Sequence, residues 1–465
     1  MMTSCRMLKG YHKLPLCAKP NLQVDASLPI NLRTAFPEAW GKLTYNHKSY
    51  APPRQRAFPS QRAGEGSLSA IRRQSPLLLI FIMVFADLLS YGIILPLLPF
   101  YVQRQQGGAA VVGSLGSLYA LMQLFSGPIM GSLSDRYGRR PVLLGCLVGT
   151  SLAYLILGVS GSLSGVFLAV ALDGITGGNL TTAYAYIADV TRPQERSRGM
   201  GMVGAAFGLG IMVGPAVGGL LSRHGLELPA IAASLIALAN VCFGLLALPE
   251  SLTPERRSQP AAWRALNPLF QLIDLFQLVS LRWLLAAIFC LNLAFSGLQT
   301  NFPLYSQQRF GWNASQNGLF FAYVGICAVL VQGVLFRWAQ PRLGEKRLAI
   351  WGLTLMAVCL AGLAVACQAW MLYPIVGLAA LGSGVSIPSL TGITSSRSSA
   401  SAQGRLMGGM QALLSLTMIL GPSMAGVSFE LISDGAPYWL GSLLSALALL
   451  LARLALRHEG EEPGE

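Results

Sequence analysis

GSLSDRYGRR, Gly131 to Arg140, is a short charged stretch between two long apolar runs. It holds one aspartate and three arginines in a chain of which only 11% of the residues are charged. Hydrophobic residues make up 53% of the chain and there are 51 glycines, a composition typical of membrane proteins rather than soluble domains. The stretch therefore indicates a polar loop that joins two membrane-spanning helices.

The apolar runs on either side of this loop continue along the rest of the chain. A hydrocarbon core about 30 Å thick needs about 20 apolar residues per crossing helix. Twelve such segments follow residue 76, and the loops between them are short. Their approximate centres are residues 89, 121, 152, 176, 211, 239, 294, 327, 357, 382, 416 and 447.

The distribution of basic residues predicts the orientation of these helices, because Lys and Arg concentrate in short loops on the cytoplasmic side. If the N-terminus is cytoplasmic, thirty of the 33 Lys and Arg residues lie in cytoplasmic segments. The outer loops contain only Arg104, Arg223 and Arg309. A missed or extra helix would place every later loop on the opposite side of the membrane. The count of basic residues therefore supports twelve spans with both ends in the cytoplasm. The net charge of +14 then requires no nucleic acid as partner.

Residues 1–76 differ from the rest, with twelve Lys or Arg against Asp25, Glu38 and Glu65. We interpret them as a basic, disordered cytoplasmic tail. A juxtamembrane arm that binds anionic lipid, an organellar transit peptide and an extension from a misassigned start codon are all compatible with this composition. Residues 457–465 form a short acidic tail at the other end.

Several kinds of chemistry find no support in the sequence. No GxxxxGK[ST] motif provides a phosphate-binding loop, and the four histidines are too scattered for a metal site. No two cysteines form a CxxC pair, and most lie in or near apolar spans as packing residues. We therefore expect no enzyme activity, no cofactor and no bound metal.

The chain resembles itself at an offset of about 205 residues. LPFYVQRQQG (98–107) matches FPLYSQQRFG (302–311), and DRYGRR (135–140) matches PRLGEKR (341–347). These matches predict an all-α membrane protein of two six-helix bundles, 77–248 and 283–456, joined by a cytoplasmic linker over 249–282. Halves of this kind, with a binding site between them near the bilayer midplane, are typical of transporters.

Three stretches resemble the major facilitator superfamily. GSLSDRYGRR is similar to its loop signature between the second and third helices, and GLGIMVGPAVGG (208–219) to the fifth-helix signature of its drug:proton antiporters. DLLSYGIILPLLPFY (87–101) resembles the first helix of tetracycline-efflux and related twelve-helix exporters. The resemblance implies the superfamily's twelve-helix fold and transport by alternating access.

The resemblance also implies a role for the charged loop. Asp135 and Arg139 would form, with Asp189 at the cytoplasmic end of span four, a latch that stabilises the outward-facing state. Gly131 and Gly138 allow close backbone approach, while Arg136 and Arg140 complete the basic signature. The arginines alternatively satisfy only the positive-inside rule. The second half has Pro341 in place of the aspartate, so we expect a single latch.

The fifth span is rich in glycine, which removes side-chain bulk and permits close helix contact. By resemblance, the antiporter signature consists of Gly210, Gly214, Pro215, Gly218 and Gly219. Ordinary helix packing explains the glycine spacing equally well. A related GPSMAG (421–426) lies at the corresponding place in span eleven.

Two carboxylates lie deep in the apolar spans. Asp87 in span one and Asp173 in span four are each roughly 13 to 15 Å from a membrane face at about 1.5 Å per residue. An acid at this depth is costly and usually faces a cavity or a partner, which suits proton exchange. Each is alternatively a protonated structural residue. Val170 stands where relatives often carry an arginine, which puts the usual arginine-assisted proton relay in doubt.

A pocket for organic compounds needs apolar walls and a few polar groups. By depth, the candidates are Tyr119, Gln123, Asn292, Gln299 and Gln411, each of which can equally make an interhelical hydrogen bond. Few basic residues lie within the spans, so an amphipathic or cationic compound fits better than an anionic one.

We therefore expect a proton-coupled efflux antiporter for small organic compounds or drugs of the tetracycline type. Its partners would be that substrate, protons and the lipid bilayer, with no nucleic acid. We expect it to act as a monomer in a bacterial inner membrane. One alternative is a uniporter or symporter for a sugar or another metabolite. A second is a transporter-like receptor or scaffold that moves no substrate.

Overall fold

The computed structural model describes residues 76–191, 195–254, 257, 267–276, 278, 281–398 and 403–457. The expected basic tail lies outside these residues except for Pro76, and the expected acidic tail except for Arg457. Regular structure in the described part is entirely helical. Twelve helices there are long and apolar enough to cross a membrane, judged by length and composition, which confirms the expected fold class.

The first half of the chain contributes six spans, of which the fourth consists of two helices. A short helix, α3 (Leu98–Arg104), joins the first two spans, and the 3₁₀ turn η3 (Ser222–His224) follows the fifth. The spans are α2 (Pro76–Ile94), α4 (Ala109–Tyr137), α5 (Arg139–Val159), α6 (Leu163–Thr176) with α7 (Asn179–Val190), α8 (Arg196–Leu221) and α9 (Glu227–Ala247).

The second half contributes the other six spans, and α11 (Pro268–Phe276) lies in the connection between the halves. Counted along the whole chain, the eighth span contains one π-helical turn, η6 (Val331–Leu335), and the 3₁₀ turn η7 (Ala369–Met371) precedes the tenth span. The spans are α12 (Arg282–Phe310), α13 (Ala314–Leu330) with η6 and α14 (Phe336–Leu343), α15 (Glu345–Val365), α16 (Leu372–Ser396), α17 (Gln403–Leu431) and α18 (Ala436–Arg457).

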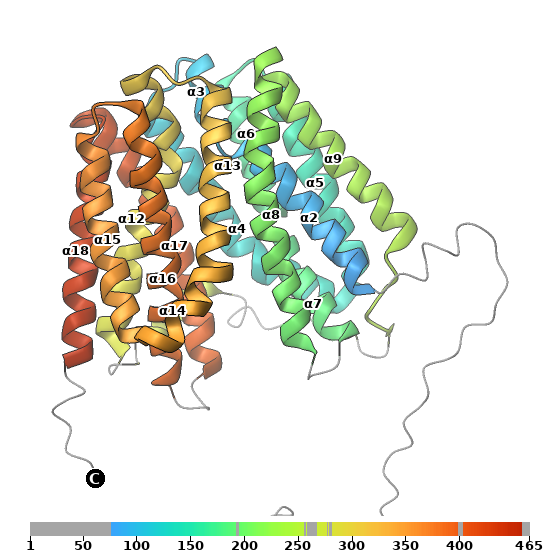
Figure 1. Cartoon of the computed structure of the whole chain (residues 1–465). Helices are drawn as coiled ribbons and strands as arrows, with labels where there is room; N and C mark the ends of the chain where they lie inside the picture. Colours follow the sequence, from blue (N-terminus) through green and yellow to red (C-terminus); the bar gives the residue numbers. More distant parts are fainter. Residues whose placement is uncertain are drawn as a thin grey trace, which may run out of the picture. The chain divides into compact units, whose positions relative to one another are not determined.

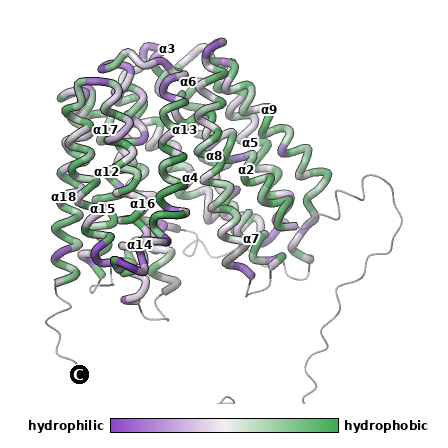
Figure 2. The backbone as a smooth tube through the Cα atoms, viewed as in Figure 1, coloured by the Kyte–Doolittle hydropathy of each residue, from purple (hydrophilic) through white to green (hydrophobic). Residues whose placement is uncertain are grey.

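The middle of each span is hydrophobic, and hydrophilic residues gather at the helix ends (Figure 2). This pattern defines two ends of the bundle. We call them the α3 end and the α7 end, because α3 lies at one of them and α7 and α14 lie at the other (Figure 1). The turn at Gly138 lies at the α7 end, since Arg139 bonds to Asp189 near the end of α7. Gly138 (φ 113°) and Gly344 (φ 75°) occupy matching turns between consecutive spans, as the sequence repeat predicts.

Within the described residues, the two halves meet mainly along two pairs of helices, α4 with α17 and α8 with α13. We call these contacts the α4–α17 seam and the α8–α13 seam. A Cβ atom on Gly219 would lie 2.9 Å from Cα of Gly318, so the backbones touch near the α3 end. Gly204 in α8 and Gly333 in η6, nearer the α7 end, have open space where a Cβ atom would be. The α8 and α13 ribbons diverge toward that end (Figure 1). The α8–α13 seam is thus tight from the α3 end to the middle of the two helices, where a Cβ atom on Gly325 would lie 2.8 Å from Cα of Met212, and it loosens toward the α7 end.

Candidate functional site

The fourth span is broken near its middle. α6 ends at Thr176, Gly177 and Gly178 follow, and α7 begins at Asn179. Glycine is a poor helix former because its backbone has the most conformational freedom to lose. A Cβ atom on Gly178 would also lie 2.8 Å from the backbone oxygen of Ser126, so the close approach of α4 requires glycine there.

Side chains bond to the backbone beside this break. The hydroxyl of Ser126 donates to the carbonyl of Ile175. The hydroxyl of Thr176 donates to the carbonyl of Leu172 at 3.0 Å and lies 3.1 Å from the hydroxyl of Thr150 in α5. Irregular backbone is tolerated at membrane depth where protein groups satisfy it in this way. The break is therefore supported from both α4 and α5.

Asp87 in α2 forms a hydrogen bond with Asn179, the first residue after this break. Nδ2 of Asn179 donates to Oδ2 of Asp87 at 2.6 Å, and Asn179 is only 8% exposed. The pair lines a cavity of about 10 Å³, enough space for about one water molecule, whose other walls are apolar except for backbone. The sequence reasoning missed Asn179, although its position directly after a Gly-Gly pair inside a span was a usable signal.

Asp173 lies on the other side of the break, near the end of α6. The hydroxyl of Tyr154 in α5 donates to Oδ2 of Asp173 at 3.3 Å. Val170, one turn earlier, is buried in the apolar core. Asp173 is thus bonded by a phenol of α5, and the arginine of the usual relay has no counterpart at position 170.

Two of the predicted substrate residues meet beside the same break. Nε2 of Gln123 donates to the hydroxyl of Tyr119 at 3.4 Å, and the ring of Tyr119 stacks on Tyr91 with centroids 5.6 Å apart. A Cβ atom on Gly177 would lie 3.2 Å from Nε2 of Gln123. This aromatic and amide surface has the mixed character that organic ligands favour.

The other three substrate candidates do not join this group in the structure. Asn292 is buried and donates from Nδ2 to the carbonyl of Ile288, one turn earlier in its own helix, at 2.8 Å. The side chains of Gln299 and Gln411 are exposed. A role for these three residues in binding substrate stays a prediction.

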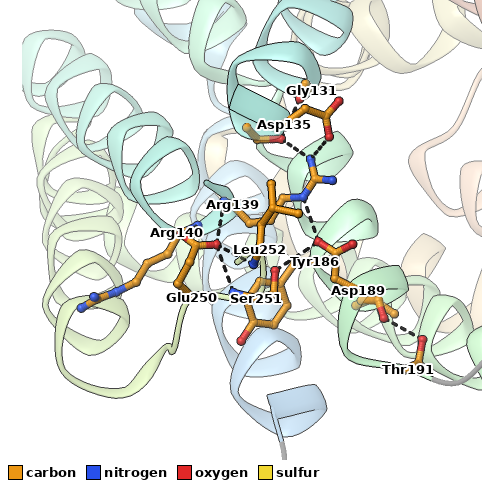
Figure 3. A network of polar contacts seen from close by, with 12 residues as sticks. Gly131, Asp135, Arg139, Arg140, Tyr186, Asp189, Thr191, Glu250, Ser251 and Leu252 are labelled. Carbon is orange, nitrogen blue, oxygen red and sulfur yellow. Dashed lines mark hydrogen bonds and ion pairs between the residues drawn. The ribbon is translucent and has the colours of Figure 1, made fainter. Parts of the chain in front are cut away.

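The charged loop forms a polar network at the α7 end (Figure 3). Nη1 of Arg139 lies 2.5 Å from Oδ1 of Asp135, and Nε of Arg139 lies 3.0 Å from Oδ2 of Asp189. The hydroxyl of Ser134 accepts a further bond of 2.7 Å from Nη1. The Arg139 side chain is 10% exposed, so charged partners compensate for its lost hydration. These contacts lie within the first half, and a latch function stays a prediction.

Glu250, which follows α9, completes this network and was missed by the sequence reasoning. Its carboxylate accepts from the backbone N–H groups of Arg139 and Arg140 at 2.9 and 3.2 Å. An anion at the first turn of α5 satisfies unpaired N–H groups and is favoured by the helix dipole. A Cβ atom on Gly138 would collide with this carboxylate, so Gly138 supplies both the turn and the space.

The remaining residues of the loop signature lie around this network. The Arg140 guanidinium donates to the carbonyl of Leu245 at the end of α9. The Arg136 side chain is exposed and lies over the Tyr137 ring, 5.2 Å from its centroid. Gly131 faces Thr181 in α7, with 3.3 Å from its ideal Cβ position to the threonine methyl group.

The glycine signature of α8 faces two different helices. Cβ atoms on Gly210, Gly214 and Gly218 would collide with α2 at Leu88, Gly92 and Ile93. Gly219 instead contacts Gly318 of α13, which also meets the carbonyl of Pro215. The signature therefore packs α8 inside the first half and also forms the α8–α13 seam. Its role in antiport stays a prediction.

Comparisons with known proteins agree with this architecture. The sequence model of the Major Facilitator Superfamily matches residues 80–365 and 329–465. The class C tetracycline resistance protein of Escherichia coli is 35% identical over 355 residues, covering 76% of this chain and 89% of that protein. The class E tetracycline resistance protein of Escherichia coli is 32% identical and covers 80% and 93%.

A solved structure shows the same similarity in three dimensions. The crystal structure of the human organic anion transporter MFSD10 superposes with a TM-score of 0.62 at 26% sequence identity. The match covers 83% of this chain and all of that chain. A match of this length includes residues of both halves.

Proposed function

Because the chain belongs to the major facilitator superfamily and is a membrane transporter, we propose that it is a proton-coupled efflux antiporter for small organic compounds of the tetracycline type. The observation that carries the proton-coupled part is the Asp87–Asn179 pair at the break in span four. A transporter needs a group that changes charge at the binding depth, and Asp87 is such a group in a small cavity of the apolar interior.

Asp87 would take up a proton from outside and release it inside, with Asp173 assisting. Asp87 is among the charged groups that act on Asp173, so the protonation of one acid affects the other. The Tyr119 and Gln123 surface beside the break would receive the substrate. The efflux direction and the tetracycline-like substrate are supported by the tetracycline resistance proteins among the relatives.

Alternating access would proceed by opening and closing the two seams. We propose that the α7 end faces the cytoplasm, with both termini on that side, and that the present structure is closed toward the outside. Gly204 and Gly333 would then move into contact when the α7 end closes. The protein would work as a monomer in a bacterial inner membrane, and the Asp135–Arg139–Asp189 network would bias this movement.

Everted membrane vesicles energised by respiration test this proposal. Tetracycline should dissipate the pH gradient in vesicles that contain the wild type, and Asp87→Asn should abolish the effect. Asp434→Asn is the matched control, because Asp434 pairs with Arg309 at the α3 end, away from the break. It should respond like the wild type.

Two results would contradict the proposed function and favour a different one. If no drug in a panel affects the gradient while labelled sugars or metabolites equilibrate across the vesicles, the chain is a facilitator. If no compound crosses at all, it is a receptor or scaffold. A response that Asp87→Asn retains would move proton coupling to another residue, with Asp173 the next candidate.

A further inference from the structure

We propose that Asn179 is a positioning residue for Asp87 and that the break in span four links this acid to the substrate surface. The inference rests on the proposed function and deepens it, because it assigns how the proton site senses the substrate. It follows from a ring of contacts that begins and ends on α2.

The first part of the ring is the amide bond to Asp87. Asn179 is the first residue of α7, so its position depends on where the preceding glycines end the helix. Its side chain is buried and has one carboxylate partner at 2.6 Å. An amide N–H stabilises a carboxylate only while donor and acceptor stay within hydrogen-bond distance. A small displacement of the break therefore changes how readily Asp87 binds a proton.

The second part of the ring ties the break to α4. Gly178 lies against Ser126, whose hydroxyl bonds to the carbonyl of Ile175, and Gly177 lies against the amide of Gln123. A Cβ atom on Gly174 would lie 2.7 Å from Cβ of Met122. Three glycines around the break thus pack closely on α4: Gly174 and Gly178 against its backbone, and Gly177 against the Gln123 side chain. Packing this close transmits small shifts, because protein interiors have little free volume.

The last part of the ring returns to α2. Gln123 bonds to the hydroxyl of Tyr119, and the Tyr119 ring stacks on Tyr91, one turn after Asp87. A flat organic molecule that stacks on these rings or displaces the Gln123 amide would shift α4 against the break. Substrate binding and proton binding at Asp87 then become coupled, and the coupling acts equally in both directions.

In the part of the chain that the structure describes, the titratable groups around Asp87 are few. Asp173 of α6, Tyr119 of α4, and Cys146 and Tyr154 of α5 are the groups on which its charge acts. Phenols and thiols are ordinarily neutral at pH 7, which leaves Asp173 as the second group that changes charge. From α9, the neutral Asn240 donates to the carbonyl of Met83 at 2.8 Å, one turn before Asp87.

Infrared difference spectroscopy on the purified full-length protein tests the first link without requiring transport. The band of the protonated Asp87 carboxyl is identified by its loss in Asp87→Asn and followed against pH. Asn179→Ala should shift the titration midpoint to higher pH by about one to two units, because it removes a hydrogen bond to the charged form. Asn240→Ala, which removes a buried amide bond to the same helix, should leave the midpoint unchanged.

Saturating tetracycline as probe tests the second link. It should shift the Asp87 midpoint in the wild type, and the shift should fall at least about threefold in Gln123→Ala. The exchanged pair Asp87→Asn with Asn179→Asp should recover part of the proton exchange that Asp87→Asn loses, because the carboxylate moves by only about one hydrogen-bond length.

Equal midpoints in Asn179→Ala and the wild type would overturn the positioning role, even if drug:proton exchange is observed. An unchanged tetracycline shift in Gln123→Ala would overturn the link to the substrate surface. Failure of the proposed function is seen separately, as wild-type vesicles whose pH gradient does not respond to drugs.

Discussion

Nε of Arg139 lies 3.0 Å from Oδ2 of Asp189, although fifty residues separate them in the chain. The contact joins the first residue of α5 to the end of α7. Asp135 bonds to the same guanidinium from α4, so one arginine holds three helix ends together. Removing one partner of such a contact costs more than removing a partner of an exposed pair, because the remaining charge stays partly buried without its counter-charge.

Arg139→Ala should lower the free energy of unfolding by about 2 kcal/mol, because Asp189, itself only partly exposed, loses its cation. Arg136→Ala is the matched control from the same loop, since Arg136 is exposed, and should change it by less than about 0.5 kcal/mol. Thermal unfolding of the purified variants in detergent measures the difference. Equal unfolding midpoints would show that the network contributes no stability.

Gly138→Ala should destabilise the protein by about 1 kcal/mol or more. Its φ of 113° is unfavourable for alanine, and the added methyl group would push Glu250 away from the start of α5. Gly145→Ala in α5 meets open space and should be neutral or slightly stabilising, because alanine is the better helix former. The unfolding midpoint of Gly138→Ala should therefore fall below that of the wild type, and the midpoint of Gly145→Ala should stay the same or rise slightly. A tolerated Gly138→Ala would show that the turn adopts another conformation.

The sequence was sufficient to predict the spans, because each requires a long apolar run that no loop interrupts. The repeat also predicted matching turns at Gly138 and Gly344, since the same short motif recurs between long helices. Their chemistry differs: Glu345 stands where Arg139 stands in the first half, and its carboxylate accepts from Gln340 at 3.0 Å. The repeat therefore predicted backbone geometry more reliably than side-chain partners.

The site was only partly predictable. Asp87 and Asp173 are conspicuous because charge is rare in apolar spans, but their partners Asn179 and Tyr154 are ordinary polar residues on other helices. Glu250 lies 111 residues after Arg139, and no local pattern connects them. Contacts between distant segments depend on how helices pack, which periodicity and composition do not encode.

A disulfide across the α4–α17 seam should stop transport. The hydroxyl oxygens of Ser117 and Ser423 are 2.7 Å apart, so sulfur atoms at these positions need little movement to bond. The double variant Ser117→Cys with Ser423→Cys should crosslink in the resting protein and lose drug efflux, and a reducing agent should restore it. Each single variant serves as a control. Efflux at the wild-type rate by crosslinked protein would mean that this seam does not open during the cycle.

Gly219→Val should loosen the α8–α13 seam and thereby slow formation of the disulfide in the double variant Ser117→Cys with Ser423→Cys. A side chain there would press on Gly318 and Ser315 of α13, and overpacking of this kind costs about 1–3 kcal/mol. If the halves move as rigid units, the α4–α17 seam must open with the α8–α13 seam, and crosslinking should be about tenfold slower. Gly204→Val, on the same helix but in open space, obstructs only closure of the α7 end. Crosslinking in that variant should be unchanged or faster. Equal rates in the two variants would show that the seams open independently, which is incompatible with a rocking movement of two rigid halves.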